Sequence, residues 1–146
     1  MKKTQKVTRV KLEIDQVHDF VLLGLVSSEP DYKLSLALNR KFSISLKNVS
    51  PVRITTADGT ELLFSRFSDS SHSPERIYNL IANRSGKQFL IKKLRNIDFI
   101  LHLNDPDNKD IVSKITSSLR DIGIITAVFN IDTDSIKDKN LHLVIQ

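Results

Sequence analysis

Two side chains of this sequence have the types and the spacing that general base catalysis uses. Asp98 and His102 lie in residues 97–104, where apolar and polar residues alternate with the period of a β-strand. Alternation puts both side chains on one face of that strand, where a carboxylate could orient an imidazole. The structural alternative is that Asp98 accepts backbone N–H groups of the preceding turn or pairs with Arg95. Aspartate side chains commonly accept hydrogen bonds from the backbone of turns, so the structural alternative is favoured.

A second candidate is a basic stretch that ends just before this strand. Residues 84–95 contain no acidic residue, and their five basic residues are Arg84, Lys87, Lys92, Lys93 and Arg95. Such a group could bind phosphate or nucleic acid, but a run of charge is more often a solvated surface. With seven Phe, two Tyr and no Trp, the chain is poorly provided with platforms for base stacking. Nucleic acid is therefore a possible partner that the sequence does not favour.

Metal and cofactor sites are not indicated. The chain has no cysteine, and none of its histidines stands at the i,i+4 spacing of a helical metal site. An acidic cluster at Asp105, Asp107 and Asp110 lacks the glycine and the terminal glutamate of a calcium loop, and helix capping explains it. Only four glycines occur, and none forms a phosphate-binding loop. The sequence predicts no metal, no cofactor and no catalytic residue set.

The stretch Ile91-Lys92-Lys93-Leu94-Arg95-Asn96-Ile97-Asp98-Phe99 resembles the signature I-P-E-x-x-x-V-D-Y of a bacterial family with no assigned role. Ile91 and Asp98 match that signature identically, and Ile97 and Phe99 are conservative replacements. The residues Lys92 and Lys93 depart from it, and Lys93 reverses the charge of the glutamate. Similarity also extends to residues 22–25, 31–34 and 38–39 and to the length of the chain. The resemblance to the IPExxxVDY family implies a bacterial cytoplasmic protein, and the motif residues are expected to serve the fold.

Composition predicts a single globular domain, residues 1–146. A chain of 146 residues with 40% apolar and 27% charged residues can bury a core without metal or disulfide bonds. No apolar run approaches the roughly 20 residues that span a bilayer, and no secretory signal follows the basic N-terminus. A cytoplasmic protein with no membrane partner is expected. The net charge of +5 permits an anionic partner without requiring one.

The first half of the chain reads as mostly strands. Residues 9–15 and 20–26 are predicted to pair through a turn at 16–18, with Gly24 marking a bulge or a close approach. Pro30 lies in the first turn of a predicted helix that ends near 39–41, and a strand at 33–38 is the alternative. A strand is predicted at 42–46, then a hairpin of 52–57 and 60–67 around Asp58-Gly59, which needs positive φ angles. A polar loop at 68–74 and a strand at 77–82 lead to a turn at 83–86.

The second half reads as strand, helix, strand, strand. The strand 97–104 is followed by a cap at 104–107 and by a helix with Ile111, Val112, Ile115 and Leu119 as its apolar stripe, which Gly123 ends. Strands at 124–131 and 141–145 close the chain around a polar loop at 132–140. This order is typical of a ferredoxin-like split unit. The predicted fold class is α+β, a mostly antiparallel sheet with two helices packed on one face.

Three functions follow from this sequence. The preferred hypothesis is a small non-catalytic domain that acts through protein contacts, including a homodimer, with residues 141–145 as an edge strand open to another chain. The second is nucleic-acid or other anion binding through the basic stretch at 84–95. The third is an enzyme that uses Asp98 and His102, which requires both side chains in one concave pocket.

Overall fold

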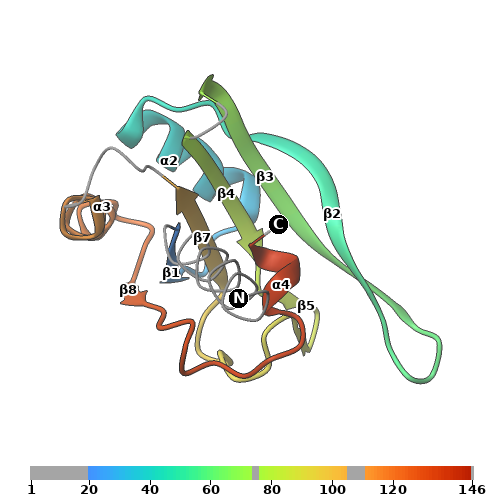
Figure 1. Ribbon diagram of the computed structural model, residues 1–146. Coiled ribbons are helices and arrows are strands. Elements are labelled where there is room, and N and C mark those ends of the chain that lie inside the picture. The colour runs from blue at the N-terminus through green and yellow to red at the C-terminus, as the bar shows by residue number, and fades with distance from the viewer. Residues whose placement is uncertain (1–19, 74–75, 105–110, 146) are drawn as a thin grey trace, which may run out of the picture.

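A computed structural model describes residues 20–73, 76–104 and 111–145 (Figure 1). One six-stranded sheet, with strand order β2-β3-β4-β7-β1-β8, organises these residues. Every pairing in it is antiparallel. The strands are β1 (Phe20–Val26), β2 (Lys47–Thr55), β3 (Glu61–Ser73), β4 (Arg76–Ala82), β7 (Phe99–Asn104) and β8 (Ala127–Asn130). A separate small hairpin, formed by the two-residue strands β5 (Arg84–Ser85) and β6 (Gln88–Phe89), is not part of this sheet. The predicted α+β class with a mostly antiparallel sheet is confirmed.

The strands β4, β7 and β1 form the centre of the sheet. Each of the first five residues of β7 is buried, because neighbouring strands flank it and side chains cover both of its faces. The apolar residues in the middle of β1 are buried for the same reason. Gly24 allows the close approach that the sequence predicts, since an added Cβ would overlap Cδ1 of Ile97. That position therefore requires glycine for space.

Both longer helices cover one face of the sheet, as predicted. The helices α2 (Asp31–Phe42) and α3 (Ile111–Arg120) bury Leu34, Leu38, Ile115 and Leu119 in one apolar cluster with Leu101 and Leu103 of β7. The other face carries a second cluster, which includes Ile81 and Ile100 and is covered by residues 90–97 and by the C-terminal segment. Figure 1 shows the C-terminal helix α4 (Leu141–Val144) on that side of β4.

The predicted strand at 141–145 is wrong, because residues 141–144 form α4. Val144 is buried in the second cluster, and Leu141 and Ile145, at i−3 and i+1, pack against the same cluster. A five-residue segment with four apolar residues satisfies helix and strand periods alike, and here the segment lies across the sheet instead of extending it. The C-terminal unit is therefore strand, helix, strand, helix, and the edge-strand pairing proposed for a homodimer has no strand to use.

The predicted strand at 42–46 is also wrong. Helix α2 continues to Phe42 and ends at Ser43, which adopts a left-handed conformation with φ 54°. The Asn39 side chain then bonds both backbone polar groups of Leu46, accepting from its N–H at 2.7 Å and donating to its carbonyl at 3.3 Å. These contacts hold residues 43–46 against the end of the helix, so they cannot join the sheet.

The hairpin around Asp58-Gly59 is confirmed, with a different turn. The N–H of Gly59 donates to Thr56 O, and only Gly59, with φ 87°, has a positive φ angle in this turn. Residues 68–73 of the loop predicted at 68–74 are strand instead, since β3 continues to Ser73, and residue 74 lies outside the described residues. The turn end of the long β2–β3 hairpin extends from the body in Figure 1. β8 and β7 are shorter than predicted.

The predicted strand at 9–15, its turn at 16–18 and the acidic cluster at 105–110 lie outside the described residues. None of the helices in residues 20–73, 76–104 and 111–145 has the length and hydrophobicity that a membrane span requires.

Candidate functional site

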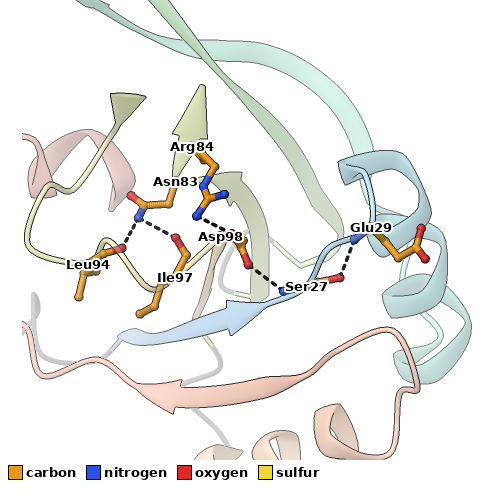
Figure 2. Close-up of polar contacts among 7 residues, drawn as sticks. All are labelled: Ser27, Glu29, Asn83, Arg84, Leu94, Ile97 and Asp98. Atoms are coloured by element: carbon orange, nitrogen blue, oxygen red, sulfur yellow. Dashed lines mark hydrogen bonds and ion pairs between the residues drawn. The ribbon is translucent and has the colours of Figure 1, made fainter. Parts of the chain in front are cut away.

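Asp98 joins the start of β7 to the end of β1. Its N–H donates to Leu25 O at 3.0 Å, and its Oδ2 accepts the N–H of Ser27 at 3.0 Å (Figure 2). The Ser27 hydroxyl in turn donates to Ile124 O and accepts the N–H of Glu29. The carboxylate therefore fixes the point at which the chain leaves the sheet toward α2, instead of capping the preceding turn as predicted.

The ion-pair partner of Asp98 is Arg84, where the sequence suggested Arg95. Arg84 Nη2 lies 3.3 Å from Asp98 Oδ1, and the guanidinium carbon lies 5.2 Å from the centre of the Phe89 ring. The small β5–β6 hairpin supplies both Arg84 and Phe89. The Asp98 side chain is 19% exposed and that of Arg84 is 50% exposed, so the pair lies at a surface.

Asn83 is the residue of this region that the sequence analysis missed. It is completely buried, and its side chain donates to Leu94 O at 2.8 Å and Ile97 O at 3.0 Å and accepts the N–H of Ile91 at 2.8 Å. Its backbone bonds Asp98 O and the N–H of Leu90. Asn83 thus holds the stretch 90–98 in shape from the end of β4. Its position directly after a strand and before Arg-Ser-Gly was the only local signal.

The apolar residues that carry the resemblance are buried. Ile91 and Ile97 belong to the second cluster, whereas Phe99 faces the first cluster with the two long helices. The predicted strand alternation, which puts Ile97 and Phe99 on one face of the sheet, is therefore wrong at this point, because β7 begins only at Phe99. The packing of these residues supports the interpretation of the stretch as structural.

A pocket of about 750 Å³ opens beside Asp98, where β1 and β4 end and β7 begins. We call it the Asp98 pocket. Its apolar lining residues are Val26, Leu63, Ala82 and Phe99. Its charged lining residues are Glu29, Asp31, Asp98 and Arg84, and hydroxyl groups come from Ser27, Ser28, Ser65 and Thr126. Three carboxylates and one guanidinium in a protein of net charge +5 make this pocket locally acidic.

His102 does not line this pocket, and the structure does not bring it to Asp98. Its Nδ1 lies 3.2 Å from Asn79 Nδ2, and its ring meets the Phe20 ring edge-on with centroids 5.5 Å apart. Burial lowers the pKa of His102 from 6.5 to about 4. A buried neutral imidazole with its own partner is not placed to act with Asp98 on a ligand in the pocket.

The basic residues predicted as an anion site are separated. Arg84 lines the Asp98 pocket, and Lys92 lines another concave region together with Lys139. The side chains of Lys87, Lys93 and Arg95 are exposed and line neither region. Within the described ranges no group of three or more His, Cys, Asp or Glu residues could hold a metal ion.

Comparison with protein-family models, with curated proteins and with solved structures finds no match to this chain. The resemblance of residues 91–99 to the IPExxxVDY family therefore stays a prediction.

Proposed function

We propose that this protein is a non-catalytic binding domain that docks on a partner protein through the Asp98 pocket. The observation that carries the proposal is the lining of that pocket, which combines the exposed side chain of Leu63 with further apolar, hydroxyl and acidic residues. Among the described residues, the exposed large hydrophobic side chains are Tyr32, Leu36, Leu63 and Phe129. Leu63 lines the pocket, and Tyr32 and Leu36 lie on α2, whose first residue lines it. Apolar and aromatic residues around a concave site are typical of protein contact surfaces.

The state of Asp98 supports binding over catalysis. One carboxylate oxygen is held by Arg84 and the other by the Ser27 N–H, so the carboxylate is committed to contacts within the protein. A general base needs a carboxylate that can reach a proton of the substrate. Arg84 is half exposed, but its guanidinium is held by Asp98 and lies over the Phe89 ring, so it is committed to contacts within the protein as well.

The pocket suits a long basic side chain of the partner. Leu63 and Phe99 offer apolar contact to the methylene groups of a lysine or arginine, whose charged end would reach the carboxylates. Two of the three lining carboxylates already have a basic partner. Asp98 is paired with Arg84, and Glu29 Oε2 lies 3.4 Å from Lys33 Nζ. Asp31 is left as the carboxylate without a basic partner among the described residues, and its Oδ1 accepts the N–H of Tyr32. The proposal includes the bacterial cytoplasmic setting that the resemblance implies.

A peptide selection tests this function. The full chain is immobilised and used to select binders from a random peptide library, and the binders are then measured by fluorescence anisotropy. We expect enrichment of peptides in which a lysine or arginine is flanked by apolar residues. The Asp31→Asn change should weaken binding about two- to fivefold, as expected for a partly exposed charge pair. The loss should shrink as ionic strength rises.

The matched control uses a second exposed apolar residue. Leu63 is 47% exposed beside the pocket, and Phe129 is 43% exposed on β8, outside it. Leu63→Ser should weaken peptide binding and Phe129→Ser should leave it unchanged. Enriched peptides without a basic residue, or equal effects of the two substitutions, would contradict the proposal.

A further inference from the structure

A second concave region shares no lining residue with the Asp98 pocket. It consists of two adjoining hollows of about 210 and 410 Å³ between the β2–β3 hairpin, β6 and the start of α4. We call it the Lys92 groove. The residues common to both hollows are Thr56, Ala57, Leu62, Gln88 and Lys92. The smaller hollow is lined in addition by Lys139 and Asn140 and by Ile54, Thr55 and Phe89.

Specific hydrogen bonds bring Lys139 to Lys92 across the chain. The Asn140 side chain donates to Leu90 O at 2.9 Å, and the backbone N–H of Lys92 donates to Asp138 Oδ2 at 3.3 Å. The other oxygen of Asp138 accepts the N–H of Asn140 at 2.8 Å. Residues on both sides of Lys139 are therefore tied to the stretch that contains Lys92, and both lysines line the same small hollow.

The two ammonium groups have no ion-pair partner in the described part of the chain. Both side chains are exposed, and neither lysine forms an ion pair with a described residue. No acidic residue lines the smaller hollow, and both oxygens of Asp138 accept backbone N–H groups. Two like charges that face one hollow repel each other, and a bound anion would relieve that repulsion.

The larger hollow has the opposite character at its far end. Asp58 lines it, accepting the Thr56 hydroxyl and the N–H of Thr60 at 3.1 Å. Asp58 is ionised at neutral pH, as an aspartate of ordinary pKa would be, and the hydrogen bond from the Thr56 hydroxyl is the main reason that its pKa falls further, to about 2. One end of the groove thus attracts an anion, and the other end repels one.

We propose that the Lys92 groove binds a phosphate monoester, with the phosphoryl group between Lys92 and Lys139 and the rest of the ligand directed toward Asp58. Two lysines act as point charges on phosphate oxygens, and the Gln88 amide adds a neutral donor. A carboxylate at the other end disfavours a second phosphate and favours a neutral or cationic group there.

This assignment differs from a nucleic-acid surface. Binding to a polynucleotide backbone needs several basic residues along a continuous track. Here Arg84 belongs to the Asp98 pocket and is paired with Asp98, and Asp58 interrupts the positive charge near Lys92. The five basic residues at 84–95 therefore do not form one footprint, and the second lysine of the groove comes from outside that stretch.

Titration of the full ¹⁵N-labelled chain tests the inference. The probes are inorganic phosphate, glycerol phosphate, phosphoethanolamine, pyrophosphate and a short single-stranded oligonucleotide. We expect saturable shifts of the Lys92, Gln88 and Lys139 amide signals with phosphate and both monoesters. Phosphoethanolamine should bind tightest, because its ammonium group can approach Asp58. Pyrophosphate should bind no more tightly than glycerol phosphate.

Charge-removing variants decide between a site and general attraction. The double variant Lys92→Gln/Lys139→Gln should weaken monoester binding at least about tenfold, which is about one logarithmic unit of affinity. Lys93→Gln removes an exposed neighbouring charge that does not line the groove, and it should have little effect. Each variant keeps its backbone N–H, and its thermal unfolding confirms that it is folded.

Three results would overturn the inference. They are unchanged binding in the double variant, equal weakening by Lys93→Gln, and oligonucleotide binding tighter than that of every monoester. Peptide binding at the Asp98 pocket is measured on the same double variant. Its retention separates failure of the groove from failure of the proposed docking function.

Discussion

The N–H of Ser27 lies 3.0 Å from Oδ2 of Asp98, and this contact joins the ends of two central strands. The same carboxylate holds Arg84, so removing it leaves two donors without their partner. We expect Asp98→Ala to lower the free energy of unfolding by about 1–3 kcal/mol. Asp98→Asn keeps one carbonyl acceptor and should lose less. Urea unfolding at neutral pH measures both changes.

A surface carboxylate provides the control for Asp98. Asp121 lies 3.9 Å from Lys41, and its side chain is 71% exposed. Asp121→Ala should cost no more than about 1 kcal/mol, as for other exposed ion pairs. If Asp98→Ala were as mild as Asp121→Ala, the linkage between β1 and β7 would not be a structural requirement.

Asn83 should be among the least replaceable polar residues. Asn83→Ala leaves the Ile97 carbonyl and the Ile91 N–H without the partner they have here, and it removes one of the two donors to the Leu94 carbonyl, which still accepts the N–H of Ile97. Since each orphaned buried group costs about 1–3 kcal/mol, two such groups give an expected loss of about 2 kcal/mol or more in unfolding free energy. Urea unfolding measures this loss, and hydrogen exchange should show an unprotected Ile91 amide.

Two further variants sharpen the Asn83 experiment. Asn83→Asp keeps an acceptor for Ile91 but loses both donors and places a carboxylate against two carbonyls, so it should not restore stability. Asn96→Ala changes an exposed asparagine in the same stretch and should stay within about 0.5 kcal/mol. An Asn83→Ala protein as stable as Asn96→Ala would refute the role of Asn83.

The sheet centre and the two long helices were predictable because local pattern determines them. The apolar run of β1 indicates burial on both faces, and the stripe of Ile115 and Leu119 indicates one helix face. Residues 141–145 were not predictable in this way. Their four apolar residues fit either period, and the chain turns there because the Asn140 side chain docks on Leu90 O, a contact that no local pattern indicates.

The site was less predictable than the fold, since its contacts connect distant residues. Asp98 is 71 positions from Ser27, and no local pattern in either segment indicates the other. Proximity in sequence favoured Arg95 as its partner, while the β5–β6 hairpin delivers Arg84 instead. Lys139 likewise reaches Lys92 only because residues 138–140 fold back onto the stretch 90–92.

Gly24→Ala should destabilise the protein through Ile97. A Cβ at residue 24 would overlap Cδ1 of Ile97 and lie 3.0 Å from its Cγ1. Ile97 is 3% exposed and has little room to move, so we expect a loss of about 1–3 kcal/mol from overpacking. Thermal or urea unfolding of the single variant measures it.

A double variant identifies that contact as the cause. Ile97→Val removes Cδ1 and by itself should cost about 0.5–1.5 kcal/mol. In the presence of Gly24→Ala the same change should cost less or should stabilise, because it removes the overlapping atom. Strict additivity of the two substitutions would show that Gly24 is needed for another reason.

The burial of His102 should make the folded protein less stable in mild acid. Asn79 Nδ2 can only donate, so Nδ1 of His102 accepts and the ring is neutral, while burial lowers its pKa from 6.5 to about 4. Unfolded chains bind the proton near pH 6.5 and the folded protein binds it only near pH 4. The contribution of the neutral His102 ring to the free energy of unfolding is therefore complete above pH 6.5. It is lost as the pH falls toward 4, by about 3 kcal/mol in total.

Substitution of the imidazole separates this effect from that of the carboxylates, which also titrate in acid. His102→Gln keeps a polar side chain for Asn79 and removes the titrating ring. Urea unfolding of both proteins between pH 4 and pH 7.5 gives the difference in their free energies of unfolding. That difference should change by about 3 kcal/mol between pH 6.5 and pH 4, in the direction that favours His102→Gln in acid. A difference independent of pH would mean that the ring takes up its proton as readily in the folded protein as in the unfolded chain, which its burial beside Asn79 and Phe20 opposes.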